Sequence, residues 1–572
     1  MERRRVKMKA SDCVAGAGAE FIEEVFLTPR LPAWFLDGTH SLPPWTPMYA
    51  WFWCGPGHGC VHGMQYAADK LSLPTHKGMF DLHLRGCGYM TPTVVDDVKE
   101  VEERTNEFKK ALGPYLDDIY GVWKGFIDEL VGMYKSLQAV NLDQCSKGEL
   151  KEQFRLTVDT YRRQWEVHWL IFDVVMNCWV AFQDMTTKLL NIDQTSPEFQ
   201  KATTGFFSKP LQIDKRQWKL GQEAIQEGLA DVFAGDSHQV IPKLEQTESG
   251  RAWLKKFHEF LEEDGWRTSR ECEINEPTWI EDPIIPIQNI QNLMKTGGKG
   301  IYKLDVLLSE HTKEREKAQK ALLEKVPAAE RDWFEAFMKV AAACGPISEE
   351  HSHYCEYWAN AMVRRCCLAI GRRFVQAGAI DKVEDIFFLN GDEVNCFIFC
   401  PEYVNMRAIV EQRRKDWEEW CKEEHPPIIG NLSQEEAFRF MLSAKDPCVM
   451  ECGFGRLPQV KEELKADLYG IPVSMGVAEG PARHVAKLEQ LIDVQPGEII
   501  VCPSADPGWT PVFGIIKGLV AAQGGTLHHA AIIGREYGIP VVSNVFAGIS
   551  QIKDGQRIRV DGDRGVVYFL DK

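Results

Sequence analysis

The chain of 572 residues is too long for one ordinary hydrophobic core, and its length predicts about two to four domains. Its apolar fraction of 44% and charged fraction of 26% are typical of a soluble globular protein. The net charge of −17 argues against a general binder of nucleic acids or anionic membranes. A local basic pocket for phosphate is still compatible with this charge.

The N-terminus, MERRRVKMKASD, is basic but is not followed by an apolar segment, so we expect no secretory signal. No run of 18 apolar residues occurs, and we therefore expect no transmembrane helix. The 17 cysteines are then expected to be reduced thiols of a cytoplasmic protein. His58, Cys60 and His62 suggest zinc, but no second ligand pair follows at zinc-finger spacing, so we expect no metal site.

The first two-thirds of the chain has the pattern of a helical body. Residues 31–95 are rich in Trp, Gly, Pro and His and lack a clear period, which predicts loops and short helices. From 96 to 195, apolar residues recur at i, i+3, i+4 and i+7, the pattern of long amphipathic helices. Helices are expected to continue through 197–265.

The second part of the body is expected to be helical as well. A Pro-rich connection at 276–288 precedes two long helices, predicted at about 304–343 and 347–378. The segment 384–390, EDIFFLN, predicts a short strand or turn.

The residue pattern changes at Leu468. From there, short runs of β-branched residues, typical of strands, alternate with Gly/Pro turns, and one helix is predicted at about 528–537. We therefore expect a multidomain fold: a large, mainly α-helical body over 1–455 and a compact α/β module over 470–572. Residues 456–469 are the expected hinge between them.

The segment AAQGGTLHHAAIIGREYGIPVV in this module carries the candidate chemistry. Gly524 and Gly525 allow a sharp turn, and the residues that follow predict a helix with His528 and His529 in its first turn. Unpaired N–H groups and the positive end of the helix dipole favour a phosphate there. A neutral imidazole has a lone pair that can attack phosphorus. Taken alone, however, two histidines after Gly-Gly are more often structural.

The longer string is more specific. It resembles the mobile phosphohistidine domain of phosphoenolpyruvate-utilising enzymes, the family of pyruvate phosphate dikinase and phosphoenolpyruvate synthase, which implies a swivelling domain whose catalytic histidine maps onto His529. His528 stands where that family has a small Ser, Thr or Cys. The residues that carry the resemblance are Asp506, Trp509, Gly524, Gly525, Thr526, His528, His529, Arg535 and Glu536.

The body has looser similarity to known sequences. WFLDGTHSLPPWTP, RRQWEVHW, FLEEDGWRTSRECEINEPTWIEDP and ISEEHSHYCEYW resemble the acceptor-binding portion of rifampicin phosphotransferase and of phenylphosphate synthase. No GxxxxGK[ST] loop or Gly-rich nucleotide segment precedes the body. The resemblance to phenylphosphate synthase implies that a separate ATP-grasp subunit binds ATP and Mg²⁺ and charges His529.

One predicted helix collects candidate residues for the acceptor site. Glu350, His351 and Tyr354 share a side within about 100°. Arg365 and Arg372 are seven residues apart and lie on one face, and Arg373 follows, so these arginines could clamp a phosphate. A solvated or salt-bridged helix face explains them equally well.

Three further inferences complete the sequence-based hypothesis. His351 and His168 are candidate bases for the acceptor hydroxyl, although each could be a structural histidine. Arg267 is a further candidate for phosphate binding by the family resemblance. The 17 tryptophans favour a small, phenolic acceptor. An antibiotic hydroxyl, pyruvate or water as acceptor stays open, as does a non-catalytic carrier or binding protein.

Overall fold

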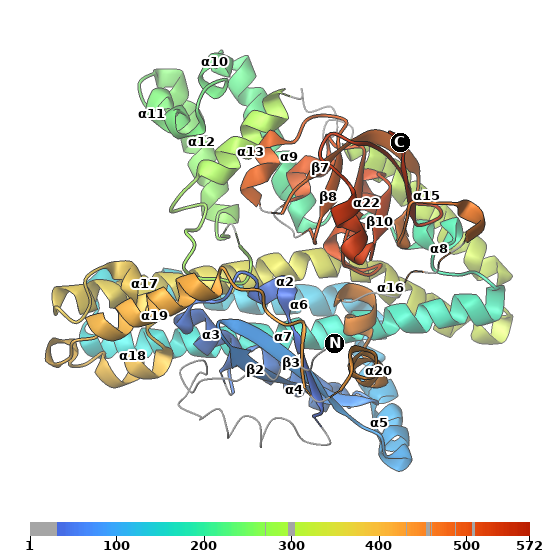
Figure 1. Ribbon diagram of the computed structural model, residues 1–572, viewed down its shortest axis with the longest axis horizontal. Coiled ribbons are helices and arrows are strands. Elements are labelled where there is room, and N and C mark those ends of the chain that lie inside the picture. The colour runs from blue at the N-terminus through green and yellow to red at the C-terminus, as the bar shows by residue number, and fades with distance from the viewer. Residues whose placement is uncertain are drawn as a thin grey trace.

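The computed structural model describes residues 31–571 except 56, 269, 296–303, 431, 454–457, 459, 461, 487 and 506–508. Figure 1 shows a layer of long helices that runs across the molecule, with the C-terminal module and a separate helical lobe on one side of it. A small sheet lies on the other side. The expected fold class, a large helical body followed by an α/β module, is confirmed. Among the described helices, none is long and apolar enough to cross a bilayer.

The long helices of the body pack around α7. This helix has 44 residues, and its start is fixed by a capping box between Ser146 and Glu149. It packs against α6, α16 and α17. A π-helical segment, η5, interrupts the run from α16 to α17, and such segments often lie at functional sites. The bounds are α6 Gly113–Gln138, α7 Lys147–Leu190, α16 Arg331–His351, η5 Ser352–Tyr357 and α17 Trp358–Gln376.

The N-terminal part of the body contains a sheet that the sequence did not suggest. Residues 31–95 form three strands as well as short helices, so the expectation of loops and short helices was incomplete. β2 and β3 form a hairpin through Arg85 and Gly86, which both have positive φ, as a two-residue turn requires. The four-stranded order is β2-β3-β1-β4. The bounds are β1 Ala33–Leu36, α2 Gly38–Ser41, α3 Pro47–Cys54, α4 Cys60–Leu71, β2 His76–Leu84, β3 Cys87–Val94, α5 Val98–Ala111 and β4 Ile428–Gly430.

A lobe of five helices projects above the layer (Figure 1). It has a core of its own, in which Trp253 and Phe257 stack with ring centroids 5.2 Å apart. Its helices are α9 Lys209–Gln226, α10 Ala230–Phe233, α11 Val240–Leu244, α12 Glu248–Asp264 and α13 Ile284–Lys295.

One predicted helix is divided in the structure. The helix expected over 304–343 ends at Lys325, because Pro327 follows, and a new helix begins at Arg331. The segment 384–390, expected to be a short strand or turn, contains a 3₁₀ helix, η6, and no strand. The other helices are α8 Pro197–Ala202, α15 Leu304–Lys325, η6 Val383–Phe388, α18 Gly391–Phe397, α19 Arg407–Trp420, α20 Gln434–Ser443 and the π segment η8 Val449–Gly453.

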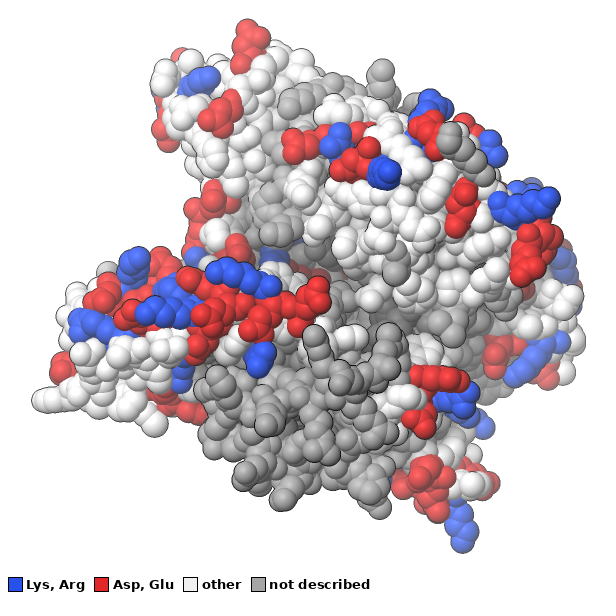
Figure 2. Space-filling model, in the orientation of Figure 1, with Lys and Arg blue, Asp and Glu red and all other residues white. Residues whose placement is uncertain are grey.

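Exposed charge does not gather into a basic patch on the face seen in Figure 2. Acidic and basic side chains alternate over α19, where pairs such as Lys415 and Glu411 neutralise each other.

The C-terminal module is built on an eight-stranded sheet with the order β5-β12-β11-β7-β8-β9-β10-β6. Its centre, β7 to β10, is parallel, and apolar cores lie on both faces. The predicted helix at 528–537 is present as α22. The bounds are β5 Leu468–Tyr469, β6 Ile471–Ser474, β7 Val477–His484, β8 Ile499–Cys502, α21 Thr510–Phe513, β9 Gly518–Ala521, α22 His529–Tyr537, β10 Val541–Ser543, β11 Arg557–Asp561 and β12 Val566–Phe569.

The module is docked on the body through α22, which packs against α15 and α16. The Glu536 carboxylate accepts hydrogen bonds from the backbone N–H groups of Gly205, at 3.0 and 3.1 Å, and Phe206, at 3.2 Å. Next to it, the Tyr537 hydroxyl donates to Asp214 Oδ2 at 3.3 Å. These polar contacts bury carboxyl groups in the interface between module and body.

We predict that docking weakens as the pH rises. Burial raises the pKa of Glu536 and of Asp214 to about 7 each, against the opposing charges of Arg535 and Arg315 at Glu536 and of Arg267 at Asp214. Because the docked state favours the protonated carboxyls, docking is strongest below their ordinary pKa values of about 4. It weakens as the pH rises from there through 7, and the radius of gyration from small-angle scattering should increase over that range.

The matched control is the double variant Glu536→Gln, Asp214→Asn, which keeps hydrogen-bonding side chains of the same size but cannot ionise. Its radius of gyration should be nearly constant between pH 5 and 8. A wild-type profile that coincides with that of the double variant would contradict the prediction.

Candidate active site

The loop before α22 is shaped by two glycines. Gly524 has φ +126°, a conformation that L side chains rarely adopt, and a Cβ at Gly525 would lie 2.0 Å from the carbonyl oxygen of Glu451. Because Gly525 has no side chain, the loop can approach Glu451 closely. The N–H of Leu527 donates to the Glu451 carbonyl at 2.9 Å, and the Thr526 hydroxyl donates to Glu451 Oε2 at 2.6 Å. The Gly-Gly turn is thereby held against η8 of the body.

His528 has the position of the N-cap of α22. Its Nδ1 accepts from the N–H of Ala530 at 3.4 Å, and its Nε2 lies 3.0 Å from the Ser504 hydroxyl. Burial, and then the charges of His529 and His40, lower the pKa of His528 to about 3, so the ring is neutral and can accept. His528 therefore performs the capping function for which Ser or Thr is preferred.

His529 is the first residue of α22 and is buried against the body. Its Nδ1–H donates to Glu349 Oε2 of α16 at 2.6 Å. Its Nε2 is buried and makes no hydrogen bond. Because a carboxylate can only accept, Glu349 fixes the proton on Nδ1 and leaves the lone pair on Nε2. Nε2 is thus the ring nitrogen whose lone pair is available to an electrophile.

The other predicted motif residues support the position of His529. Arg535 donates to the carbonyls of Thr526, at 2.8 Å, and Val473, at 2.9 Å, and so ties α22 to its own loop and sheet. Trp509 is buried in the core of the module. Glu536 makes the docking contact described above. Asp506 lies outside the described residues.

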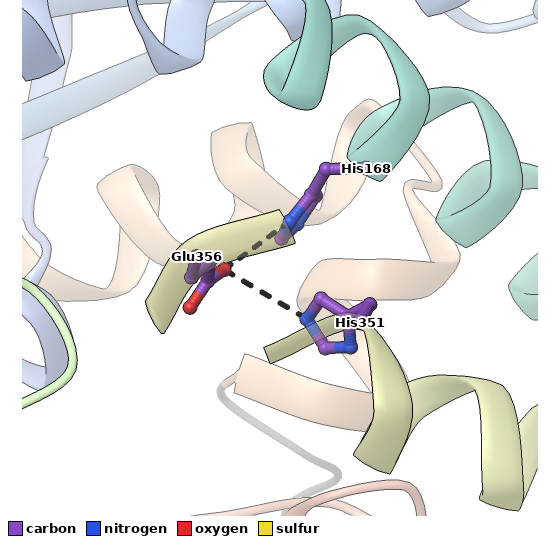
Figure 3. Close-up of side chains that lie close together, drawn as sticks. All are labelled: His168, His351 and Glu356. Atoms are coloured by element: carbon purple, nitrogen blue, oxygen red, sulfur yellow. Dashed lines mark ion pairs between the residues drawn. The ribbon is translucent and has the colours of Figure 1, made fainter. Parts of the chain in front are cut away.

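A polar cluster lies in the body below the docked module. Figure 3 shows His168 of α7, His351 at the end of α16 and Glu356 of η5 pointing toward one another. His168 Nδ1 lies 3.2 Å, and His351 Nε2 lies 3.8 Å, from Glu356 Oε1. Burial lowers the pKa of His168 to about 3 and that of His351 well below its ordinary value, so both are neutral. The two residues predicted as candidate bases are brought together, but each is a weak base here.

Two further groups surround this cluster. The Glu271 carboxyl forms a hydrogen bond with Glu356, and burial raises the pKa of both groups. His40, partly exposed, has its Nδ1 2.8 Å from both carboxylate oxygens of Asp37. Burial opposes the charged ring of His40, but Asp37, Glu356 and Glu271 together raise its pKa to about 9. His40 is therefore a cation at neutral pH.

The predicted grouping of Glu350, His351 and Tyr354 is only partly formed. Glu350 Oε2 accepts from Trp123 Nε1 at 2.8 Å, and the Tyr354 ring packs edge-on against Trp123. His351 instead faces α7. The three side chains thus point to two sides of the helix: Glu350 and Tyr354 both meet Trp123, while His351, the residue next to Glu350, lies about 100° further round the helix.

Arg267 is buried between two aromatic rings, with its guanidinium carbon 4.6 Å from the centroids of Trp279 and Tyr357. Its charge lowers the pKa of Asp214, the partner of Tyr537. Arg267 therefore lies on the side of the body that faces the module.

The expected phosphate clamp of Arg365, Arg372 and Arg373 is not formed at this site. Arg365 donates to the carbonyls of Leu137, Gln138 and Val140 at the end of α6. Arg372 bonds Asp143, and Arg373 donates to the carbonyls of Asp143 and Cys145. The three residues do share a region, as expected, but their donors hold the connection from α6 to α7 instead of facing His529.

His58, Cys60 and His62 are also separated from one another. Cys60 Sγ accepts from Trp169, His62 lies 3.1 Å from Glu166, and His58 Nε2 lies 3.2 Å from the carbonyl of Trp51. Within the described part of the chain, the cysteines are free thiols, in agreement with the expected reduced state.

Sequence reasoning missed Glu349, Glu356, Glu451 and His40. A usable signal was present for two of them. The run SEEHSHYCEYW places many polar residues in a helix that is otherwise apolar, and buried polar residues require partners. Glu451 gave no such signal, because its partner Thr526 lies 75 residues away in the sequence. His40 has a local partner in Asp37, but nothing in the sequence marks this pair as part of the site.

Comparisons with known proteins agree with this arrangement. Residues 494–565 match the family described as "PEP-utilising enzyme, mobile domain", and residues 173–348 match "Rifampicin phosphotransferase fourth domain". The C-terminal module is therefore similar to the mobile domain of PEP-utilising enzymes, and part of the helical body is similar to the fourth domain of rifampicin phosphotransferase. The resemblance of both parts noted from the sequence is confirmed.

Three relatives give the extent of the similarity. The chain is 30% identical over 384 residues to "Uncharacterized phosphotransferase YvkC" of Bacillus subtilis (strain 168), which covers 66% of this chain and 44% of that protein. It is 30% identical over 339 residues to the rifampicin phosphotransferase of Bacillus cereus, covering 58% and 36%. It is 29% identical over 548 residues to chondramide synthase cmdD of Chondromyces crocatus, covering 94% and 14%. The chain spans less than half the length of each of these relatives.

We predict that Glu349→Ala releases the fixed tautomer of His529. Without the carboxylate, both ring nitrogens of His529 should carry the proton in part, which ¹⁵N spectra of histidine-labelled protein can measure. Loss of this charge-assisted hydrogen bond should also weaken docking by about 1.5–3 kcal/mol.

Glu350→Ala is the control, because Glu350 is the adjacent carboxylate and bonds Trp123 instead. It should leave the His529 tautomer unchanged. An unchanged tautomer in Glu349→Ala would show that the hydrogen bond across the interface does not orient the ring.

Proposed function

We propose that this chain is a phosphotransferase component that carries a phosphoryl group on Nε2 of His529 and passes it to a hydroxyl acceptor on the helical body. The observation that carries the proposal is the hydrogen bond from His529 Nδ1 to Glu349, which leaves the buried Nε2 as the nucleophile. The phosphotransferases among the relatives support the reaction class.

The charging step requires the module to leave the body. In the docked state His529 is 8% exposed, so a nucleotide bound elsewhere cannot reach Nε2. We propose that a nucleotide-binding ATP-grasp partner, holding ATP and Mg²⁺, transfers the β-phosphoryl group to Nε2 with release of AMP, while water takes the γ-phosphoryl group as inorganic phosphate. The module would swing about the segment 456–469 between the two sites.

The transfer step takes place when the charged module docks again. The acceptor oxygen attacks phosphorus in line, a P–O bond forms and the P–Nε2 bond breaks. The hydroxyl proton is lost from the acceptor, and Nε2 regains its lone pair, so that the net products are a phosphate ester and a proton. The His40 cation stabilises the negative charge of the transferring group, and Glu349 keeps the imidazole oriented as it leaves.

The lining of the polar cluster favours an aromatic acceptor. The rings of Trp165 and Trp169 lie 4.9 and 5.0 Å from the ring of His168, and Phe172 lies 4.9 Å from the ring of His351. Such rings stack well on an aromatic substrate. A phenol also ionises more readily than an alcohol, which suits a site whose histidines are weak bases. We therefore propose a small phenol, as in phenylphosphate synthase, and a cytoplasmic location where ATP is supplied.

Charging is tested with potassium phosphoramidate, a small donor that phosphorylates accessible histidines without a partner. After digestion, the acid-labile phosphate should be on the peptide that contains His529. His529→Asn should abolish this phosphopeptide, whereas His528→Ala should retain it. Label on other histidines alone would sink the proposal.

Acceptor choice is tested with the charged protein after the donor is removed. Phenol, an aliphatic alcohol, pyruvate and water are offered in parallel, and phosphate ester formation is followed by ³¹P spectra. We expect the P–N signal of phospho-His529 to decay at least 10-fold faster with phenol than with the others. Charging without transfer to any acceptor would favour a non-catalytic carrier.

A further inference from the structure

We propose that His168, His351 and Glu356 bind one divalent transition-metal ion, of the Zn²⁺ type, that coordinates the acceptor hydroxyl. The site deepens the proposed function and rests on it for the identity of the oxygen that the ion holds. The three residues come from α7, the end of α16 and η5, and Figure 3 shows their side chains converging.

The distances fit one ion. One ligand atom from each residue lies within 4.8 Å of the other two, and the two nitrogens lie 3.2 and 3.8 Å from Glu356 Oε1. Ligand bonds of about 2.0–2.2 Å in a tetrahedral Zn²⁺ site place the ligand atoms about 3.3 Å apart. Among the residues that the structure describes, no other group of three potential ligands meets the same criterion.

The contacts within the cluster leave a potential ligand atom without a hydrogen bond. His168 is 4% exposed, and its buried Nδ1 faces Glu356 Oε1 at 3.2 Å without forming a hydrogen bond. A buried polar atom without a partner is costly, and a bound metal ion would give this nitrogen and the Glu356 oxygen a common partner.

The second layer around the cluster is also that of a metal site. Glu271 bonds the Glu356 carboxyl, and the backbone carbonyls of Ile347 and Ser348 lie against the ring of His351. Carboxylates and carbonyls of this kind orient metal ligands. The set of two imidazoles and one carboxylate leaves a fourth position free, which is the composition of a catalytic rather than a structural zinc site.

The cluster and the contact of His529 both use the C-terminal end of α16. Glu349, which holds His529, is two residues before His351 on this helix. The charges of Glu349, Glu271 and Glu356 all raise the pKa of Cys452 of η8, whose carbonyl accepts a hydrogen bond from the N–H of Gly525 in the loop before His529. An acceptor oxygen on the fourth position would lose its proton more easily to solvent and would attack the phosphoryl group on Nε2.

The experiment measures metal binding by the full chain directly. Protein freed of metal by chelator dialysis is titrated with Zn²⁺ by calorimetry, and with Co²⁺ by its visible absorption bands. We expect about one equivalent of each ion to bind per chain, and a Co²⁺ spectrum of four- or five-coordinate type. His168→Gln, His351→Gln and Glu356→Gln should each lose this binding by at least 100-fold.

His62→Ala is the matched control, because His62 forms another His–Glu contact in the body, 3.1 Å from Glu166. It should bind the metal like the wild type. Circular dichroism and thermal unfolding of each variant, without metal, separate loss of binding from loss of fold. If a ligand variant does not fold, the Co²⁺ spectrum of the wild-type protein tests the proposal instead. A spectrum without nitrogen ligation would contradict it.

Two outcomes overturn the inference: no stoichiometric binding by the wild type, or binding that the three ligand variants retain. Neither affects the charging of His529, which phosphoramidate measures in the same preparations. Failure of the metal site and failure of the proposed function are therefore distinguishable. If both hold, transfer to phenol should fall at least 10-fold in the metal-free protein, whereas phospho-His529 should still form.

Discussion

The hydrogen bond between His529 Nδ1 and Glu349 joins the two halves of the molecule at the reacting group. It orients the imidazole, chooses Nε2 as the nucleophile and helps to hold α22 against α16. It also creates an electrostatic conflict. A phosphoryl group on Nε2 brings negative charge into a buried region that already contains Glu349, Glu271 and Glu356. In the proposed cycle, docking of the phosphorylated module therefore requires positive charge nearby, and His40, a cation at neutral pH whose charge lowers the pKa of His528, is our candidate for it.

The docking interface contains carboxyl groups whose burial disfavours their ionised forms. Glu536 and Asp214 both have pKa values raised to about 7, which means that their ionised forms are disfavoured in the docked state. An interface of this kind is specific, because each carboxyl has defined partners, but its stability is limited. Limited stability suits the proposed cycle, in which His529 is released to be charged and returns to transfer.

The sequence predicted His529 and its loop because the information is local: two glycines, a capped helix and a fixed string place one histidine at a helix start. The partners could not be predicted in the same way. Glu349 lies 180 residues away, and choosing it over Glu350 requires the helix register at single-residue precision. The sequence correctly placed three arginines together: Arg365, Arg372 and Arg373. It did not predict what they bind, because their partners are carbonyls at the end of α6 and in the connection to α7. The hairpin β2–β3 was missed because its glycines and prolines hid the alternation of buried residues.

The π segment η5 explains why Glu349 and Glu356 contact different groups. Glu349 and Glu356 are seven residues apart, so in a regular α-helix they would lie on the same face. A π turn takes more residues per turn, and it rotates Glu356 away from that face. Glu349 is thereby left to hold His529, while Glu356 turns toward His168 and His351. A regular helix would set two buried carboxylates side by side next to the phosphoryl group, and their repulsion would oppose both docking and transfer.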